Sequence, residues 1–213
     1  MKVLRYLTGI ALSVPLSIAQ SYAAGELNNQ ATIEQSGAGD NAVVNQTGEN
    51  NQAYIDQAVF DESGRIITDV GGGSASVIQN GQRNYSRIND QGIGNTIAVE
   101  QQQIQNQMTA MVSGSDNAIQ TIQNGTMQLS AVDIQGDMNA IQSYQEGENN
   151  SFSATVDGNG NDVSQLQIGQ NNVSSLEIIG DGNTINQSQS GNGLSYQLQF
   201  TGNGQAISVS QTN

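Results

Sequence analysis

Alternating apolar and polar positions return every eleven residues along this chain, from Gln35 to Gln211, without a single insertion. Each unit opens with an amide, continues with alternate residues that are often apolar, and ends with Gly. Alternation with a period of two is typical of a β-strand, while Gly accepts the positive φ of a tight turn. The pattern therefore predicts strands of about seven residues joined by turns of about four.

A second period appears when the chain is read every twenty-two residues, because the units are of two alternating kinds. The first kind has an aliphatic residue at a fixed inward position, namely Ile97, Ile119, Ile141, Val163, Ile185 and Ile207. Its amides are Asn95, Asn117, Asn139, Asn161, Asn183, and then Gln101, Gln123, Gln145, Gln167, Gln189 and Gln211. The second kind replaces that Gln by Val112, Ile134, Val156, Ile178 and Phe200. We expect the two kinds to form the two walls of a thin core, roughly 10 Å apart.

These periods predict an all-β solenoid, in which each coil of twenty-two residues is a strand, a turn, a strand and a turn. About eight and a half coils would fit between Asn29 and Gln211, stacked about 4.8 Å apart. Buried amides are costly alone, but in register each donates to the copy on one side and accepts from the copy on the other. The amides above are thus predicted to form structural ladders beside the aliphatic column, and a polymer of such coils would be cross-β.

One stretch departs from the pattern. Near residues 58–73 the amide positions hold Glu62 and Thr68, and Val59 and Val70 stand where Gly is expected. The count of eleven is nevertheless kept. We therefore predict an irregular coil near 58–73 that keeps its place in the stack, within a single repeat domain.

Residues 1–23 have the layout of a secretory signal peptide, with Lys2 and Arg5, an apolar run from Leu7 to Ile18, and a predicted cut after Ala23. The repeat domain would then comprise residues 24–213. The apolar run is too short for a membrane span and no later run replaces it, so we expect no transmembrane anchor. Without Cys, the exported chain would use no disulfide.

The predicted exported chain is strongly acidic. Cleavage leaves Arg65, Arg83 and Arg87 against nineteen acidic residues, a net charge of −16. This charge argues against nucleic acid or an anionic membrane as a partner. Self-repulsion would instead keep an assembly-prone chain dispersed.

Candidate chemistry is sparse. The chain has no His and no Cys, and carboxylates such as Asp133, Glu146, Asp157 and Glu177 form no convergent constellation. Short turns leave no room for the cleft in which carboxylates would cleave a polysaccharide. We therefore expect neither an enzyme nor a cofactor.

Turn segments that contain Asp40, Asp116 and Asp181 are compatible with two interpretations. Calcium-binding solenoids place Asp at fixed positions of a nine-residue repeat, whereas here the period is eleven and Asp is irregular. Asp and Asn also suit turns because their side chains bond to local backbone groups. The spacing favours the turn interpretation.

Apolar bulk gathers near the carboxyl end, where Leu194, Tyr196, Leu198 and Phe200 lie in one unit. One interpretation is a well-filled core layer, because aromatic side chains bury a large area. The other is an assembly end that a partner's first coil covers. The sequence leaves both open.

The units Asn150–Gly158, Asn161–Gly169 and Asn183–Gly191 resemble curlin repeats, the building blocks of bacterial curli fibres. The shared motif is an amide, alternate aliphatic residues, Gln, then Gly and a following Asn. The segment Ala53–Ala58 is especially similar to the minor, nucleating curlin subunit. The resemblance extends over nearly all of residues 24–213, although alternate units carry Val, Ile or Phe where the curlin motif has Gln.

This resemblance implies a secreted subunit of extracellular amyloid fibres at the bacterial cell surface, used for biofilm matrix and adhesion. It implies as partners further copies of the chain, a second curlin-type subunit and an outer-membrane secretion pore, and it leaves open whether the chain is a bulk subunit or a nucleator. The alternative is a monomeric β-solenoid that acts as an adhesin or binds ice. Ice binding requires a regular flat face, whereas outward residues change from Ser151 and Ser153 to Asp162 and Ser164 in the next unit.

Overall fold

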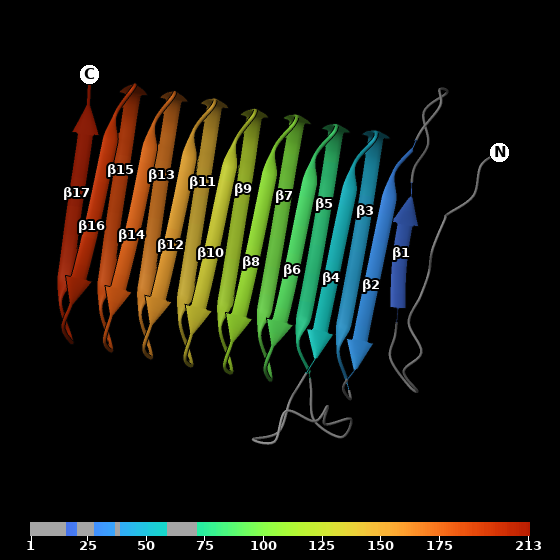
Figure 1. Cartoon of the computed structure of the whole chain (residues 1–213), viewed down its shortest axis with the longest axis horizontal. Helices are drawn as coiled ribbons and strands as arrows, with labels where there is room; N and C mark the ends of the chain where they lie inside the picture. The colour runs from blue at the N-terminus through green and yellow to red at the C-terminus, as the bar shows by residue number, and fades with distance from the viewer. Residues whose placement is uncertain (1–15, 21–27, 37–38, 59–71) are drawn as a thin grey trace.

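The computed structural model describes residues 16–20, 28–36, 39–58 and 72–213, and every regular element among them is a β-strand. The strands wind into a solenoid of about eight coils, with one strand of each coil in each of two parallel sheets (Figure 1). The nine-stranded sheet contains β1 (Leu16–Gln20), β3 (Asn41–Glu49), β5 (Ser74–Gln82), β7 (Thr96–Ile104), β9 (Ala118–Thr126), β11 (Ala140–Glu148), β13 (Asp162–Gln170), β15 (Thr184–Asn192) and β17 (Ala206–Thr212). The eight-stranded sheet contains β2 (Gln30–Ser36), β4 (Gln52–Ala58), β6 (Tyr85–Gln91), β8 (Gln107–Ser113), β10 (Leu129–Gln135), β12 (Ser151–Asp157), β14 (Val173–Ile179) and β16 (Ser195–Thr201).

Neighbouring strands pair in a register of twenty-two residues from β5 onwards. Ile141 of β11, for example, lies opposite Ile119 of β9 on one side and Val163 of β13 on the other. Identical or similar side chains therefore stack on one another from coil to coil. The predicted all-β solenoid with twenty-two residues per coil is confirmed.

The two half-coils differ in length, which the equal strands predicted above did not anticipate. Strands of the eight-stranded sheet have seven residues, but β3 to β15 in the other sheet have nine. Their pairing continues through Gly147, which lies opposite Gly169 with φ +112° and has no room for a Cβ beside the Gly169 carbonyl. Only Asn149 and Asn150 then connect β11 to β12, while four residues connect β12 to β13. The prediction of a uniform four-residue turn is therefore wrong for alternate turns.

The register of twenty-two residues is interrupted between β4 and β5. β3 pairs directly with β5 and β4 with β6, each with partners thirty-three residues apart. The predicted irregular coil falls largely on residues 59–71, which lie outside the described residues. The expectation that this unit keeps its place in the stack is wrong, because eleven residues add no layer between the flanking strands. Glu62 and Thr68 would have interrupted the ladders, whereas the observed pairing joins Gln46 Nε2 to Gln79 Oε1 at 2.8 Å.

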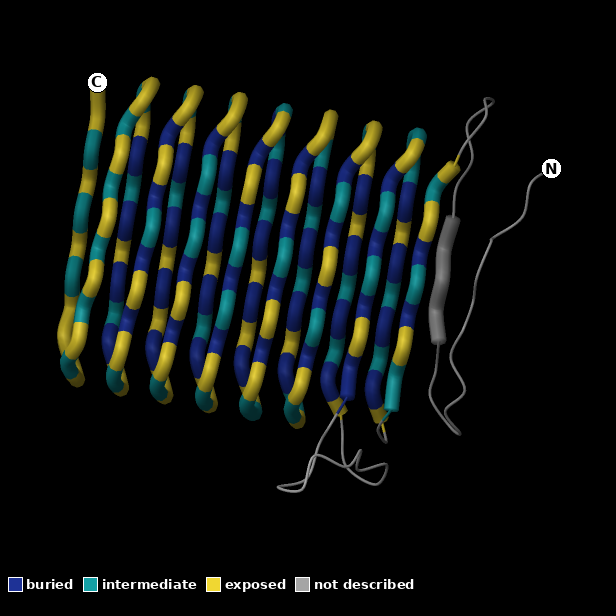
Figure 2. Tube along the Cα trace, in the orientation of Figure 1, coloured by how far each residue is buried: buried dark blue, intermediate teal, exposed yellow. Residues whose placement is uncertain are grey.

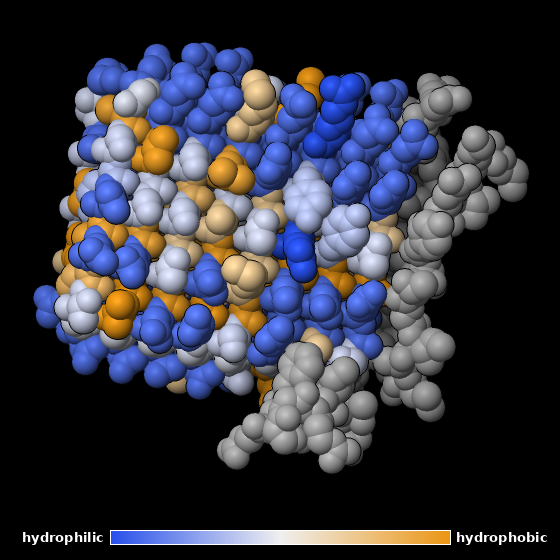
Figure 3. Space-filling model, in the orientation of Figure 1, coloured by the Kyte–Doolittle hydropathy of each residue, from blue (hydrophilic) through white to orange (hydrophobic). Residues whose placement is uncertain are grey.

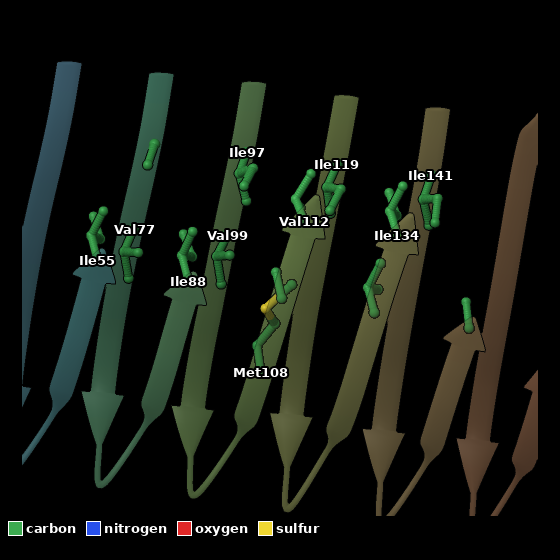
Figure 4. Packing of buried hydrophobic residues seen from close by; sticks show 14 of the residues in the cluster. Ile55, Val77, Ile88, Ile97, Val99, Met108, Val112, Ile119, Ile134 and Ile141 are labelled. Carbon is green, nitrogen blue, oxygen red and sulfur yellow. The ribbon is translucent and has the colours of Figure 1, made fainter. Parts of the chain in front are cut away.

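The core lies between the two sheets, lined by every second residue of each strand (Figure 2). Ile97, Ile119 and Ile141 lie at the same height on successive strands of one sheet, and Val112 and Ile134 lie beside them from the other sheet (Figure 4). The core is thus a thin apolar sheet sandwich that runs the length of the solenoid. Each layer buries only a few side chains and depends on its neighbours to cover them.

The outward residues form a mixed surface. On the broad face seen in Figure 3, hydrophobic side chains are interspersed among hydrophilic ones. Exposed aliphatic residues such as Leu129 and Val173 are separated by residues such as Ser151 along their column. In the part of the chain that the structure describes, no helix has the length and apolar character needed to cross a bilayer.

Candidate assembly interface

A line of glutamines runs inside the nine-stranded sheet, parallel to the solenoid axis. It contains Gln46, Gln79, Gln101, Gln123, Gln145, Gln167, Gln189 and Gln211. Each Nε2 donates to the Oε1 of the next Gln at 2.8–3.0 Å. The second Nε2 hydrogen reaches across the core, as from Gln145 to the Leu129 carbonyl at 2.8 Å. Each internal Gln therefore uses both donor hydrogens, so burial of its amide is compensated.

A second line of amides lies at the start of the same strands and contains Asn95, Asn117, Asn139, Asn161 and Asn183. The Asn139 backbone N–H donates to Asn117 Oδ1 at 2.9 Å, and its Nδ2 donates to the same oxygen at 3.1 Å. The Nδ2 also donates to the Gly158 carbonyl at 2.8 Å, in the corresponding turn of the next coil. These bonds tie each turn to the equivalent turns of the coils on both sides of it.

The aliphatic column lies between the two amide lines. Ile97, Ile119, Ile141, Val163 and Ile185 are buried, and Ile207 is half-buried in the last strand. Sequence reasoning placed these residues together. It missed the bonds from the glutamines to backbone carbonyls of the opposite sheet, because the sequence pattern does not fix how the two walls are offset.

The glutamine line has a direction, and its two ends are chemically different. Every Nε2 points toward the carboxyl end, so the last residue, Gln211, has an Nε2 that bonds only to the Ser195 carbonyl, at 3.1 Å. At the other end, Gln46 Oε1 is buried and receives no hydrogen bond from any residue that the structure describes. One end of the line thus offers a donor and the other an acceptor.

The carboxyl end of the solenoid is an uncovered layer. β16 and β17 are the outermost strands of their sheets, and their inward residues are half-buried where those of earlier coils are buried. Tyr196, Leu198 and Phe200 pack against the core on one side only. Burial raises the pKa of Tyr196 above its usual range. The apolar unit near the carboxyl end is therefore both a core layer and an end of the stack.

At the amino end, β2 is the outermost strand of the eight-stranded sheet. β1 lies along β3 as the outermost strand of the nine-stranded sheet, with Leu16 opposite Ala42 and Gln20 opposite Gln46. β1 falls within the predicted signal peptide. Cleavage after Ala23 would remove it and leave β3 at the edge.

A shorter amide line begins in the eight-stranded sheet and is interrupted by an acid. Gln35 Nε2 donates to Gln57 Oε1 at 2.9 Å, but the next inward position is Asp90 and the one after it is Val112. The Asp90 carboxylate accepts a bond from Asn95 Nδ2 at 2.6 Å, beside the space that Gly73 leaves empty. Burial is the main cause that raises the pKa of Asp90 to about 6. The charge of Asp40 also raises this pKa, whereas hydrogen bonds from the amides of Asn95 and Gln57 lower it.

We expect Asp90→Asn to stabilise the protein at pH 7. A folded-state pKa of about 6 against an ordinary value of 3.8 means that the folded state holds a proton that the unfolded chain releases. The contribution of Asp90 to the free energy of unfolding is therefore most favourable below pH 4. It falls by up to about 3 kcal/mol as the pH rises to 7. The variant removes that loss, which urea unfolding at pH 4, 5.5 and 7 measures.

The control for Asp90→Asn is Asp162→Asn, which removes an exposed carboxylate at the start of β13. It makes the same change in net charge without changing the core. An equal stabilisation by both variants at pH 7 would mean that general charge repulsion, and not burial of Asp90, causes the effect.

The turn acids make hydrogen bonds to the backbone. Asp181 Oδ1 accepts from the Asn159 N–H at 2.8 Å, and Asp40 Oδ1 accepts from the N–H groups of Gly72 and Gly73. These contacts agree with the turn interpretation. Across residues 28–36, 39–58 and 72–213, no three His, Cys, Asp or Glu side chains lie close enough together to hold a metal ion.

Residues 28–58 match the family model of the curlin associated repeat. This segment is similar to a curlin repeat. The match includes β2, β3 and β4, which form the first coil and a half, and the later coils of the chain continue the same alternation of strands. No curated protein and no solved structure matches the chain.

Proposed function

We propose that this protein is a curlin-type secreted subunit of an extracellular amyloid fibre, which grows by stacking the coils of successive copies end to end. The observation that carries the proposal is the glutamine line, which ends in a donor at Gln211 and in an acceptor at Gln46 that receives no hydrogen bond from the residues the structure describes. A strand paired to β17 in the twenty-two-residue register would extend the line. The added strand would also continue the backbone hydrogen bonds of the sheet.

The ends also lack the usual protection against strand addition. Natural sheet edges are blunted by Pro, by Lys, by bulges or by inward charges. After residue 23 the sequence has neither Pro nor Lys. The inward residues of the last strand, β17, are Ile207, Val209 and Gln211, all uncharged.

Export, biofilm and adhesion complete the proposal. The predicted signal peptide supports secretion, and the curlin repeat favours passage through an outer-membrane pore to a fibre at the bacterial cell surface. The acidic net charge of the processed chain, residues 24–213, would keep it dispersed before assembly. A fibre of stacked copies would contribute to a biofilm matrix and to surface adhesion.

Electron microscopy and fibre diffraction of the purified processed chain test the proposal. We expect unbranched fibres with reflections near 4.8 Å along the axis and near 10 Å across it. The matched variant Val209→Lys places a charge at the inward face of the last strand and should prevent elongation while earlier coils stay folded. A processed chain that stays monomeric, or one that binds a surface as a folded monomer without forming fibres, would favour a monomeric adhesin instead.

A further inference from the structure

The last coil lacks the amides of the eight-stranded sheet that join one coil to the next. Where most earlier units open with Asn, its β16 unit opens with Leu194, and Phe200 stands at the position that holds Gln35 and Gln57 in the first coils. In the nine-stranded sheet Gln211 keeps its place, and Gln205 stands where Gln128 of an earlier unit accepts the Asn150 N–H. The carboxyl end therefore offers amides on one wall and an apolar second wall.

The first coil keeps its amides on both walls. In the nine-stranded sheet, Gln46 Oε1 receives no hydrogen bond from the described residues. In the eight-stranded sheet, Gln35 Nε2 donates to Gln57 Oε1, so the Oε1 of Gln35 is the acceptor at the outer side of the first coil. Just before most strands begin, a backbone N–H donates to the side-chain oxygen of the equivalent residue in the preceding coil. The Asn51 N–H donates to Asn29 Oδ1, and the same bond recurs up the stack, for example from Asn139 to Asn117. A coil placed before the first one is thus expected to supply two Gln donors and two side-chain acceptors.

A second copy of the chain would supply these groups on the nine-stranded wall alone, where Gln211 can donate and Gln205 can accept as Gln128 does from the Asn150 N–H. Continuing the twenty-two-residue register past β17 places Gln46 of the incoming copy on Gln211, which is a match. The same register places Gln35 on Phe200 and Asn29 on Leu194, which are mismatches, because neither apolar side chain can donate or accept a hydrogen bond. A buried acceptor that loses its donor weakens an interface.

The edge of the nine-stranded sheet at the amino end does accept a strand. β1 pairs with β3 in parallel, and its Gln20 falls at the register position of Gln46. This is the position that the glutamine line would assign to Gln in any coil added there. The edge is therefore competent for parallel pairing in the register that continues the line.

We propose that the amino end of this chain, β2 and β3, docks on the last coil of a different β-solenoid subunit, one that carries Asn and, six residues later, Gln in both half-coils. Such a coil supplies the two donors and two acceptors that the first coil lacks. The inference rests on the proposed function and specifies the partner at one end of the stack. The chain then forms a junction between an amide-rich coil and its own apolar last coil.

The test uses a variant of this chain as the amide-rich partner. Leu194→Asn, Phe200→Gln and Gln205→Asn together restore the pattern on both walls of the last coil and define the amide-ended variant. Its control is Leu194→Val with Phe200→Leu, which alters the same layer without adding amides. We expect the amide-ended variant to assemble with a critical concentration about tenfold lower than that of the control, because each recovered hydrogen bond contributes about 1 kcal/mol.

The decisive measurement is the coupling between residues 35 and 200. They lie in the first and the last strand of one sheet, so within one copy they are separated by six intervening strands. Gln35→Leu should lower the critical concentration of the parent, where Phe200 of another copy would face it, and should raise that of the amide-ended variant. Coupling of this sign, measured as a double-mutant cycle, can only arise between copies.

Two outcomes are clearly separated. Fibres from every variant, with equal critical concentrations and no coupling between residues 35 and 200, would overturn the inferred partner and leave fibre formation intact. Absence of fibres from every variant, with β structure retained by circular dichroism, would instead overturn the proposed function and this inference with it.

Discussion

Ile141→Asp is expected to cost more than about 4 kcal/mol of folding free energy and to abolish fibre formation. Ile141 is 1% exposed, with Ile119 and Val163 directly above and below it. A carboxylate there has no partner and no water, and burial of an unpaired charge is among the few changes that destabilise a protein this strongly. Because like side chains stack, the damage extends to the layers on either side.

Urea unfolding followed by circular dichroism measures the loss for Ile141→Asp, and electron microscopy measures the fibre yield. The matched control is Gln142→Asp, which puts the same charge one residue further on β11, on the outward face. The control should unfold within about 0.5 kcal/mol of the parent. Parent-like assembly by Ile141→Asp would mean that residues twenty-two apart do not stack in the fibre.

The register could be predicted from sequence because each column uses nearly the same residue in every coil. A Gln at 101, 123 and 145 is informative only when a neighbouring copy can satisfy it, so regular spacing of buried amides implies stacking in register. The aliphatic column adds the same information independently. Both features depend only on contacts between neighbouring coils, and a repetitive sequence contains the same contact in every coil.

The omitted unit could not be predicted in this way, because the spacing of eleven continues through it. Sequence periodicity depends only on the number of residues between equivalent positions, whereas the stacking of strands depends on which side chains come to lie against one another. Pairing β3 with β5 joins Gln46 to Gln79 and avoids a layer with Glu62 and Thr68 at the amide positions. Asp90 was missed for a related reason, since its environment depends on Gly73, which enters the stack only after that unit is left out.

Unequal strand lengths are a further feature that the equal units conceal. Gly147 and Gly158 occupy equivalent sequence positions, yet Gly147 lies inside a strand and Gly158 in a turn. The two glycines differ because the two turns that close each coil differ in length. One turn is made by Asn149 and Asn150 alone, with φ +54° at Asn149, and the other by four residues.

Gln145→Glu should destabilise the protein by more than about 3 kcal/mol at pH 7, although the two side chains have nearly the same shape. Gln145 Nε2 donates to Gln167 Oε1 at 2.9 Å and to the Leu129 carbonyl at 2.8 Å. A carboxylate would replace both donations with contacts between oxygens, inside a residue that is 0% exposed. Two acceptors would lose their donor and a charge would be buried, and each change alone costs about 1–3 kcal/mol or more.

The pH dependence of Gln145→Glu separates the ladder from simple packing. Burial and the neighbouring oxygens would raise the pKa of the new carboxyl, so the folded state would hold a proton that the unfolded chain releases above about pH 4. The loss relative to the parent should therefore be smaller at pH 5 than at pH 7, because the protonated carboxyl can donate one of the two bonds. Gln142→Glu, on the outward face of β11, is the control and should show no such recovery. An equal loss at both pH values would mean that shape alone, and not donation along the glutamine line, determines stability at this position.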